Sequence, residues 1–220
     1  SACYKLGLFM VLFRTAYTLG IEPFFFSHAK NENAPQTYAT ITKYFVIFGS
    51  FILLSVIVFA DVLKYIMLRD SSYWEAMRVV PLIILANFCL GIYNNLSVWY
   101  KLTDRTKMGA YISIVGAVLT LVLNYLLIPK FSYYGSAIAT IAAYGSMMFI
   151  SYVLGNRYYP IPYDMEKIGG YLGLSILFSA ISFYGFRENY FVGIPLLLLF
   201  VHFVYHNEKA TILSIIKRKK

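Results

Sequence analysis

The chain has 220 residues, of which 60% are hydrophobic and only 13% are charged, and its formal net charge is +9. Soluble proteins average roughly half apolar and about a quarter charged residues. This composition excludes an ordinary soluble domain and indicates a membrane protein. In such a protein the basic residues report topology, so we expect no nucleic-acid partner and treat membrane lipids as the surroundings.

About seven apolar stretches follow one another, and each is close to or above the roughly 17–25 residues that a spanning helix needs. Only short polar hinges separate them, so no linker could hold a soluble domain. The sequence predicts an all-α, polytopic membrane helical bundle with about seven transmembrane helices. The predicted spans are residues 3–27, 40–60, 73–100, 108–128, 135–155, 167–186 and 190–206.

The first stretch carries an arginine at mid-depth, where an ionisable side chain is costly and by default functional. Arg14 shares a helix face with Thr18 and Glu22, and roughly 12 Å of rise separates Arg14 from Glu22. A guanidinium that faces an aqueous cavity would suit a phosphate or carboxylate, because its planar fork donates paired hydrogen bonds. The alternative is an internal ion pair between Arg14 and a carboxylate on a neighbouring or missing helix.

Charged residues of both signs close the second stretch. Asp61 and Lys64 lie three residues apart at its end, with further charges close by in the sequence. Mixed charges at the end of a span are usually solvated, so we expect Asp61 and Lys64 to form a solvated rim.

The third stretch carries several amides on one face together with a glycine. Amides can hydrogen-bond the hydroxyl groups of a sugar, and they also bridge membrane helices with modest energy. Both interpretations stay open, with packing favoured. The residues concerned are Asn87, Gly91, Asn94 and Asn95, and the stretch is preceded by Ser72-Tyr-Trp-Glu75, which has the pattern of a helix capping box.

The fourth and fifth stretches are predicted to form a hairpin. Pro129 is expected to stop the fourth stretch after Ile128, because proline lacks an amide proton and disfavours helix in the residue before it. Small and polar residues then recur at helical spacing on both sides of the turn, which lets two backbones approach closely in a bilayer. We therefore predict that Gly116, Thr120 and Asn124 of the fourth helix pack against Gly135 and Ala139 of the fifth.

Lys and Arg residues gather at one end of the predicted bundle. The positive-inside rule places that end, and with it the C-terminus, in the cytoplasm. We expect the basic tail, residues 208–220, to anchor on anionic lipid there. The basic residues at this end are Lys30, Lys43, Lys101, Arg105, Lys107, Arg157, Lys167, Lys209 and those of the tail.

The sequence lacks the patterns of a catalytic or cofactor-binding site. The three histidines have no carboxylate or cysteine at metal-ligand spacing, and Cys3 and Cys89 fall in apolar stretches, where thiols behave as small apolar groups. There is no glycine-rich phosphate loop, Gly-x-Ser-x-Gly elbow or Asp-x-Asp pair. We therefore expect no catalytic residues, no metal and no cofactor, and we expect that the protein is not an enzyme.

Three short runs resemble those of a known transporter family. They are Leu102-Thr-Asp-Arg-Thr106, Leu123-Asn-Tyr-Leu-Leu-Ile-Pro129 and Tyr134-Gly-Ser-Ala-Ile-Ala-Thr140. With Ser136 in place of an alanine, the second and third runs resemble Asn-x-x-Leu-Ile-Pro and Gly-Ala-Ala-x-Ala-Thr of the polysaccharide biosynthesis flippases. These are the O-antigen and capsule translocases of the multidrug/oligosaccharidyl-lipid/polysaccharide exporter superfamily, and the resemblance extends over residues 1–205.

The resemblance implies the C-terminal lobe of a MATE-like transporter with about 12–14 helices in two lobes. Residues 1–160 would hold the C-lobe transmembrane helices and residues 161–207 two additional transmembrane helices. The chain has neither a start methionine nor a signal peptide, so we expect that an N-terminal lobe of the same chain is missing. The resemblance also implies a multi-pass location in the bacterial cytoplasmic (inner) membrane.

The activity implied by the resemblance is transfer of an undecaprenyl-linked oligosaccharide from the cytoplasmic to the outer leaflet. The lipid-linked oligosaccharide would be the partner, with coupling to protons or sodium left open. In these flippases cationic residues that line the cavity meet the lipid pyrophosphate. Arg14 is the candidate for that role, with Lys5 and Glu22 as weaker ones and Thr18, Asn87 and Asn94 as further cavity residues.

Two other functions are alternatives to the flippase. A MATE-type drug/cation antiporter of the same superfamily would need an acidic site in the membrane centre, for which the spans offer Glu22 alone. The membrane domain of a glycan acyltransferase or polymerase would need a catalytic His/Asp pair or a long outer loop, and neither is present. The sequence therefore favours the flippase.

Overall fold

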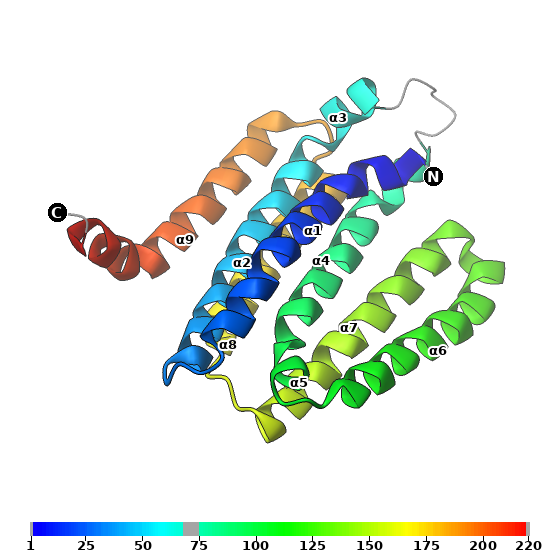
Figure 1. Ribbon diagram of the computed structural model, residues 1–220. Coiled ribbons are helices and arrows are strands. Elements are labelled where there is room, and N and C mark those ends of the chain that lie inside the picture. Colours follow the sequence, from blue (N-terminus) through cyan, green and yellow to red (C-terminus); the bar gives the residue numbers. More distant parts are fainter. Residues whose placement is uncertain (1, 68–74, 219–220) are drawn as a thin grey trace.

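The computed structural model describes residues 2–67 and 75–218, and within them the side chains of residues 7–66 and 77–211. In this part of the chain the regular secondary structure is entirely helical (Figure 1). Seven of the helical segments are long and apolar enough to cross a membrane. The protein therefore has the all-α, polytopic membrane fold that the sequence predicts.

The long helices follow the predicted order, with shifts of a few residues at their ends. They are α1 (Ala2–His28), α2 (Ala34–Val58), α4 (Val80–Leu96), α6 (Thr106–Phe131), α7 (Tyr133–Tyr158), α8 (Met165–Ala180) and α9 (Tyr190–Arg218). Short elements adjoin them: α3 (Ala60–Met67), the 3₁₀ helix η2 (Glu75–Val79), α5 (Val98–Leu102) and the π-helical turn η3 (Ile181–Gly185). The third span thus runs from η2 through α4 to α5.

Some predictions concern residues beyond those described. Ser72 of the expected capping box lies outside them, and so do the side chains of Glu75, of Lys5 and of the tail from Ile212 onward. The boundary at residue 208 has no counterpart in the backbone, because α9 continues unbroken from Tyr190 to Arg218. The division into domains and a tail stays a prediction.

The fourth span ends later than predicted. We expected Pro129 to stop it after Ile128, but α6 continues through Pro129 to Phe131. Proline removes one amide proton, yet the next turn is still closed, since the Ser132 amide donates to the Ile128 carbonyl at 2.8 Å. Ser132 has a φ of 50°, which a right-handed helix cannot contain, and so this residue ends α6 and starts the turn into α7.

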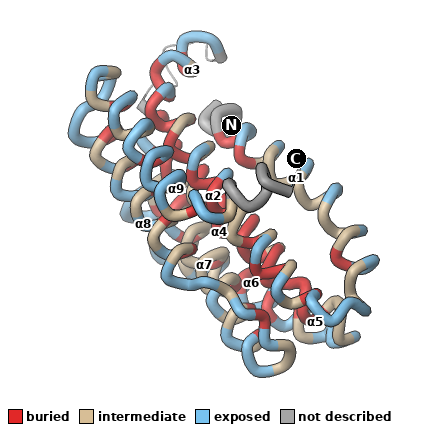
Figure 2. The backbone as a smooth tube through the Cα atoms, turned by 90° about the vertical axis from the view of Figure 1, so that its left-hand side faces the viewer, coloured by how far each residue is buried: buried red, intermediate tan, exposed pale blue. Residues whose placement is uncertain are grey.

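Helices α2 and α4 form the centre of the bundle. The main apolar core contains Phe45 and Leu53 of α2, Ile84 and Phe88 of α4, and Tyr171 of α8. Around this pair, α1 packs on both α2 and α4, α8 and α9 pack on α2, and α7 packs on α4. Helix α6 contacts mainly α7 at the outer edge, and most of its surface is exposed (Figures 1 and 2).

The bundle has two ends, which we name for use below. The first end holds α3, the turn between α6 and α7, and the joint between η3 and α9. The second end holds the connections from α1 to α2, from α5 to α6 and from α7 to α8, together with the later part of α9. The second end is the one that the basic residues predict to be cytoplasmic.

The α6–α7 hairpin is packed through its small residues. A Cβ built on Gly116 would lie 2.4 Å from the Met147 sulfur, and one built on Gly135 would lie 2.5 Å from the Leu127 carbonyl oxygen. Ala139 is fully buried. The Thr120 hydroxyl donates to the Gly116 carbonyl of its own helix at 2.8 Å, and Asn124 Oδ1 is buried without a hydrogen-bond partner among the described residues.

An ion cluster at the first end ties α3 to the joint before α9. Asp61 accepts hydrogen bonds from Arg187 Nη2 at 3.0 Å, from Arg187 Nε at 3.2 Å and from Lys64 Nζ at 2.9 Å. The prediction of a solvated rim is wrong, because Asp61 is 5% exposed and Lys64 4% exposed. The approach of Arg187, 126 residues away in the sequence, buries them.

Burial alone would raise the pKa of the Asp61 carboxyl. The hydrogen bonds and positive charges of Arg187 and Lys64 outweigh burial, and they hold this pKa below its usual value. The cluster therefore stabilises the folded state in its ionised form.

Gly135→Ala is expected to destabilise the protein by about 2 kcal/mol, because the Leu127 carbonyl belongs to the backbone and cannot turn aside. Gly145→Ala is the matched control, since nothing lies within 4 Å of a Cβ at that position of the same helix. Thermal unfolding of both purified variants in one detergent measures the difference. Equal unfolding temperatures would contradict the close contact in the hairpin.

Asp61→Asn is expected to lower the free energy of unfolding at neutral pH by about 3 kcal/mol, since it removes the charge of the buried carboxylate that the Arg187 and Lys64 side chains share. The folded pKa of Asp61 lies below the unfolded value of about 3.9. The stabilisation is therefore complete above that value and is lost as pH falls through the folded pKa. Unfolding temperatures of wild type and Asp61→Asn should converge below about pH 4.

The exposed Asp104→Asn variant is the control for this titration. A wild-type protein that keeps its full advantage over Asp61→Asn in acid would show that the ion cluster does not carry the stabilisation.

Candidate functional site

Polar side chains line the contact between α1 and α4 and run toward the second end. The stem of Arg14 lies over Gly91, since a Cβ built on Gly91 would be 3.5 Å from Arg14 Cγ. Further along, the Tyr17 hydroxyl donates to Asn95 Oδ1 at 2.5 Å. We call this row the α1–α4 seam, and it consists of Arg14, Tyr17, Thr18, Glu22, Asn94, Asn95 and Lys101.

Arg14 lies near the middle of α1, between the two ends of the bundle. Its Nε atom is buried and has no hydrogen-bond partner among the described residues. No carboxylate within the described part of the chain forms an ion pair with it. Glu22, the carboxylate on the same helix face, pairs with Lys101. An arginine inside a bilayer is costly without an anion beside it. The arrangement can therefore receive an anionic group from outside the described residues.

A cleft opens between α1 and the α4–α5 segment on the side of the second end. Its polar lining comes from the seam, and its apolar lining comes from Ile21, Phe25, Phe26 and Val98. The Thr18 hydroxyl and the Asn94 amide line it, and neither forms a side-chain hydrogen bond with the described residues. Both groups are available to hydrogen-bond a ligand, as the hydroxyl groups of a sugar require.

The charged pair of the cleft is Glu22 on α1 with Lys101 on α5, whose side chains are in hydrogen-bond contact. Both are partly exposed at the cleft, so a ligand can reach either charge. An anion could replace Glu22 beside Lys101, whereas a cation would have to replace Lys101 beside Glu22. The pair thus neutralises the cleft in the absence of a ligand.

The structure brings some of the predicted site residues together and separates others. Thr18, Glu22 and Asn94 meet in the cleft, and Arg14 lies about one turn from Thr18 and about two turns from Glu22 along α1. Asn87 does not line this cleft, since its amide donates to the Ile83 carbonyl of its own helix at 2.9 Å. Their roles in binding stay predictions.

The sequence interpretation missed two members of the cleft. Tyr17 carries no signal of its own in the sequence, and Lys101 serves there only as an indicator of topology. Helical spacing was the available signal, because Lys101 follows Asn94 by two turns on the same face. The pairing of α1 with α4 was needed to place both beside Glu22.

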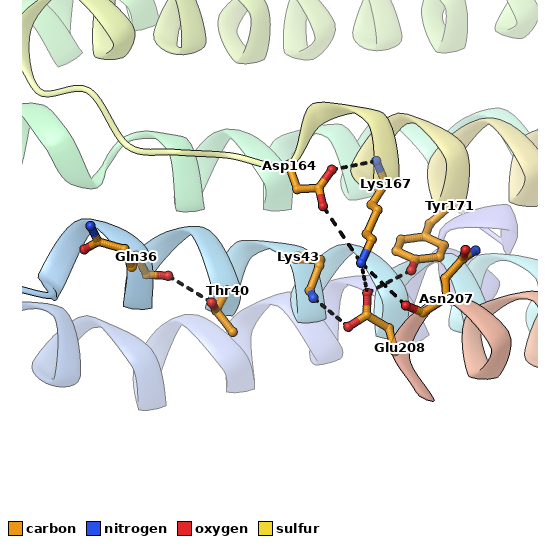
Figure 3. Close-up of polar contacts among 8 residues, drawn as sticks. All are labelled: Gln36, Thr40, Lys43, Asp164, Lys167, Tyr171, Asn207 and Glu208. Atoms are coloured by element: carbon orange, nitrogen blue, oxygen red, sulfur yellow. Dashed lines mark hydrogen bonds and ion pairs between the residues drawn. The ribbon is translucent and has the colours of Figure 1, made fainter. Parts of the chain in front are cut away.

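A second polar cluster joins α2, α8 and α9 near the second end (Figure 3). Glu208 of α9 is 1% exposed and accepts a hydrogen bond from Lys43 Nζ at 2.6 Å. It also accepts from the Tyr171 hydroxyl at 3.0 Å and from Lys167 Nζ at 3.3 Å. A buried carboxylate with these donors ties three helices together, and the sequence interpretation missed it because it assigned residue 208 to the tail.

No metal site is found in the part of the chain that the structure describes. It contains no group of three or more His, Cys, Asp or Glu side chains that could hold a metal ion. Cys89 is a free thiol buried in the bundle.

Glu208→Gln is expected to lower the free energy of unfolding by about 3 kcal/mol, because it leaves the ammonium groups of Lys43 and Lys167 without their buried carboxylate. Glu166→Gln, an exposed acidic position at the start of α8, is the matched control. Thermal unfolding in detergent measures both. Two variants of equal stability would mean that the cluster does not hold α9 to the bundle.

Comparison with known proteins identifies the family. The family model described as MatE matches residues 6–126, which include the whole α1–α4 seam and most of α6. No curated protein and no solved structure matches the chain significantly. The family match covers more than half of the chain and contains four of its seven candidate spans in whole or large part. The chain therefore belongs to the MatE family, whose members are multi-pass membrane transporters.

Proposed function

We propose that the protein translocates a lipid-linked oligosaccharide of the undecaprenyl pyrophosphate class across the bacterial cytoplasmic membrane. The oligosaccharide delivered to the outer leaflet would be used to build O-antigen or capsular polysaccharide. Arg14 is the observation that carries this proposal. It is a cation near the middle of a spanning helix, its Nε is buried, and the described residues give it no anionic partner.

A pyrophosphate would supply the missing anion. The planar guanidinium donates paired hydrogen bonds to phosphate oxygens, and in a medium of low dielectric such a pair is much stronger than in water. A substrate that brings its own negative charge removes the cost of the buried cation only while it is bound. Binding and release at Arg14 would thus be linked to passage of the head group.

The remaining polar groups of the seam suit a carbohydrate. The Thr18 hydroxyl and the Asn94 amide are free to form hydrogen bonds, and aromatic rings such as Phe25 and Phe26 line the same cleft. Sugars offer hydroxyl groups at their edges and apolar C–H faces, which this combination can contact. The seam therefore fits an anionic group attached to a polar glycan.

A drug/cation antiporter is the second candidate, since the family match is to MatE and an acidic residue lies in the cleft. Glu22 would be its cation-binding residue. We place this candidate second because Lys101 already neutralises Glu22. An organic cation would have to displace an ammonium group, whereas a pyrophosphate would find Arg14 without a partner.

Arg14→Ala, expressed in the organism's own cells, is expected to lower the amount of surface glycan about ten- to a hundredfold. This is the effect on binding expected when a hydrogen bond to a charged group is lost. Arg14→Lys keeps the charge but not the fork, so it should retain part of the activity. Arg78→Ala removes an exposed arginine at the first end and is the control. Surface glycan is measured together with the amount of protein in the membrane.

Normal surface glycan in Arg14→Ala cells that contain the usual amount of protein would overturn the role of Arg14. The function itself is tested in a strain that lacks the gene, by determining the leaflet in which lipid-linked oligosaccharides accumulate and by recording drug susceptibility. Accumulation in the cytoplasmic leaflet, reversed by the wild-type gene, supports the flippase. Unchanged glycan lipids with increased drug sensitivity would favour the antiporter.

A further inference from the structure

A stack of side chains stands at the outer edge of the second end, away from the α1–α4 seam. Trp99 of α5 is buried, and its Nε1 donates to the carbonyl and hydroxyl oxygens of Ser151 at 3.1 and 3.2 Å. The Tyr158 ring stacks on Trp99 with a centroid distance of 5.7 Å and an interplanar angle of 16°. Tyr158 is therefore a ring held in a fixed position.

Two arginines converge on this ring from different elements. The guanidinium carbon of Arg105, in the connection between α5 and α6, lies 4.2 Å from the Tyr158 ring centroid. That of Arg157, at the end of α7, lies 5.9 Å from the same centroid. Such contacts hold a cation in place without using its hydrogen-bond donors.

The donors of both arginines are unused within the described part of the chain. Neither guanidinium forms an ion pair or a side-chain hydrogen bond there, although both residues are exposed. Asp104, the neighbouring carboxylate in the sequence, is also exposed and does not pair with Arg105. Two like charges at one ring repel each other, and a shared anion between them would remove that repulsion.

The start of α6 adds positive potential to this site. The N-terminus of α6 begins directly after Arg105, has no side-chain cap and has no acidic residue in its first turn. It also carries Lys107, which is exposed. The unpaired amides at the start of a long helix attract an anion, and so do the two guanidinium groups.

The location points to lipid as the source of the anion. Trp99, Tyr100, Tyr158 and Tyr159 cluster at this end, and Trp and Tyr concentrate at the level of lipid head groups. Helix α6 lies at the outer edge of the bundle, so its start is accessible to lipid. Basic pockets between membrane helices at the cytoplasmic side are sites for anionic head groups.

We propose that Arg105 and Arg157, positioned by the Tyr158 ring, form a binding site for the phosphate of an anionic phospholipid head group. Each guanidinium would donate paired hydrogen bonds to phosphate oxygens. The site is separate from the seam proposed for the transported substrate, so it is independent of the proposed function. An anionic lipid bound there would hold the α5–α6 connection to the end of α7.

The experiment measures binding of phosphatidylglycerol to the protein in nanodiscs of phosphatidylcholine. Native mass spectrometry and thermal unfolding report the lipid retained and the stabilisation that it gives. Arg105→Gln and Arg157→Gln should each weaken binding about fivefold, and the double variant about 25-fold. Lys30→Gln removes one charge from an exposed position at the same end, as each single arginine variant does, and should leave binding unchanged.

Three further results decide the proposal. Arg105→Lys combined with Arg157→Lys keeps the charge but loses the fork, so binding as strong as wild type would show a diffuse surface effect and overturn the site. A loss in the Lys30→Gln control equal to that of a single arginine variant would do the same. Inorganic phosphate or glycerol phosphate that protects the protein as well as phosphatidylglycerol would overturn lipid as the source, and helical circular dichroism of each variant checks that it is folded.

Discussion

A charge among membrane helices needs a partner, because the bilayer core supplies no water to solvate it. This constraint organises the structure more than any single apolar contact. Asp61 holds α3 to the joint before α9 at the first end, and Glu208 holds α9 to α2 and α8 at the second. The two carboxylates thus fix α9 at both ends, although this helix buries little of its own surface in the bundle.

Arg14 departs from this rule, because the described residues give it no anionic partner. The buried carboxylates Asp61 and Glu208 are paired with protein cations, whereas Arg14 has a buried Nε without a partner among the described residues. A fixed protein partner would keep the arginine neutralised throughout a transport cycle. A partner that travels with the substrate neutralises it only in the bound state, which is what a translocating site requires.

The α1–α4 seam is held by a packed frame. Helix α6 packs closely on α7, and α2 and α4 are largely buried. Gly116 and Gly135 allow the hairpin backbones to approach to distances that a side chain would prevent. The hairpin packs on α4 through α7, and α4 carries the asparagines of the seam. The same hairpin ends beside Trp99, so the aromatic stack that supports Arg105 belongs to this packed frame. The seam proposed for the substrate and the proposed lipid site therefore share one scaffold without sharing residues.

The sequence alone determined the class of fold and the order of the seven spans, because span length and hydropathy are local properties. It also placed Arg14, Thr18 and Glu22 on one helix face. It failed where the outcome depended on a neighbour. Pro129 stays inside α6, since Ser132 ends that helix, and Asp61 is buried because Arg187 reaches it. The partners Glu22 and Lys101 are 79 residues apart and Lys43 and Glu208 are 165 apart, so only the rotation and contact of packed helices could decide which charges meet.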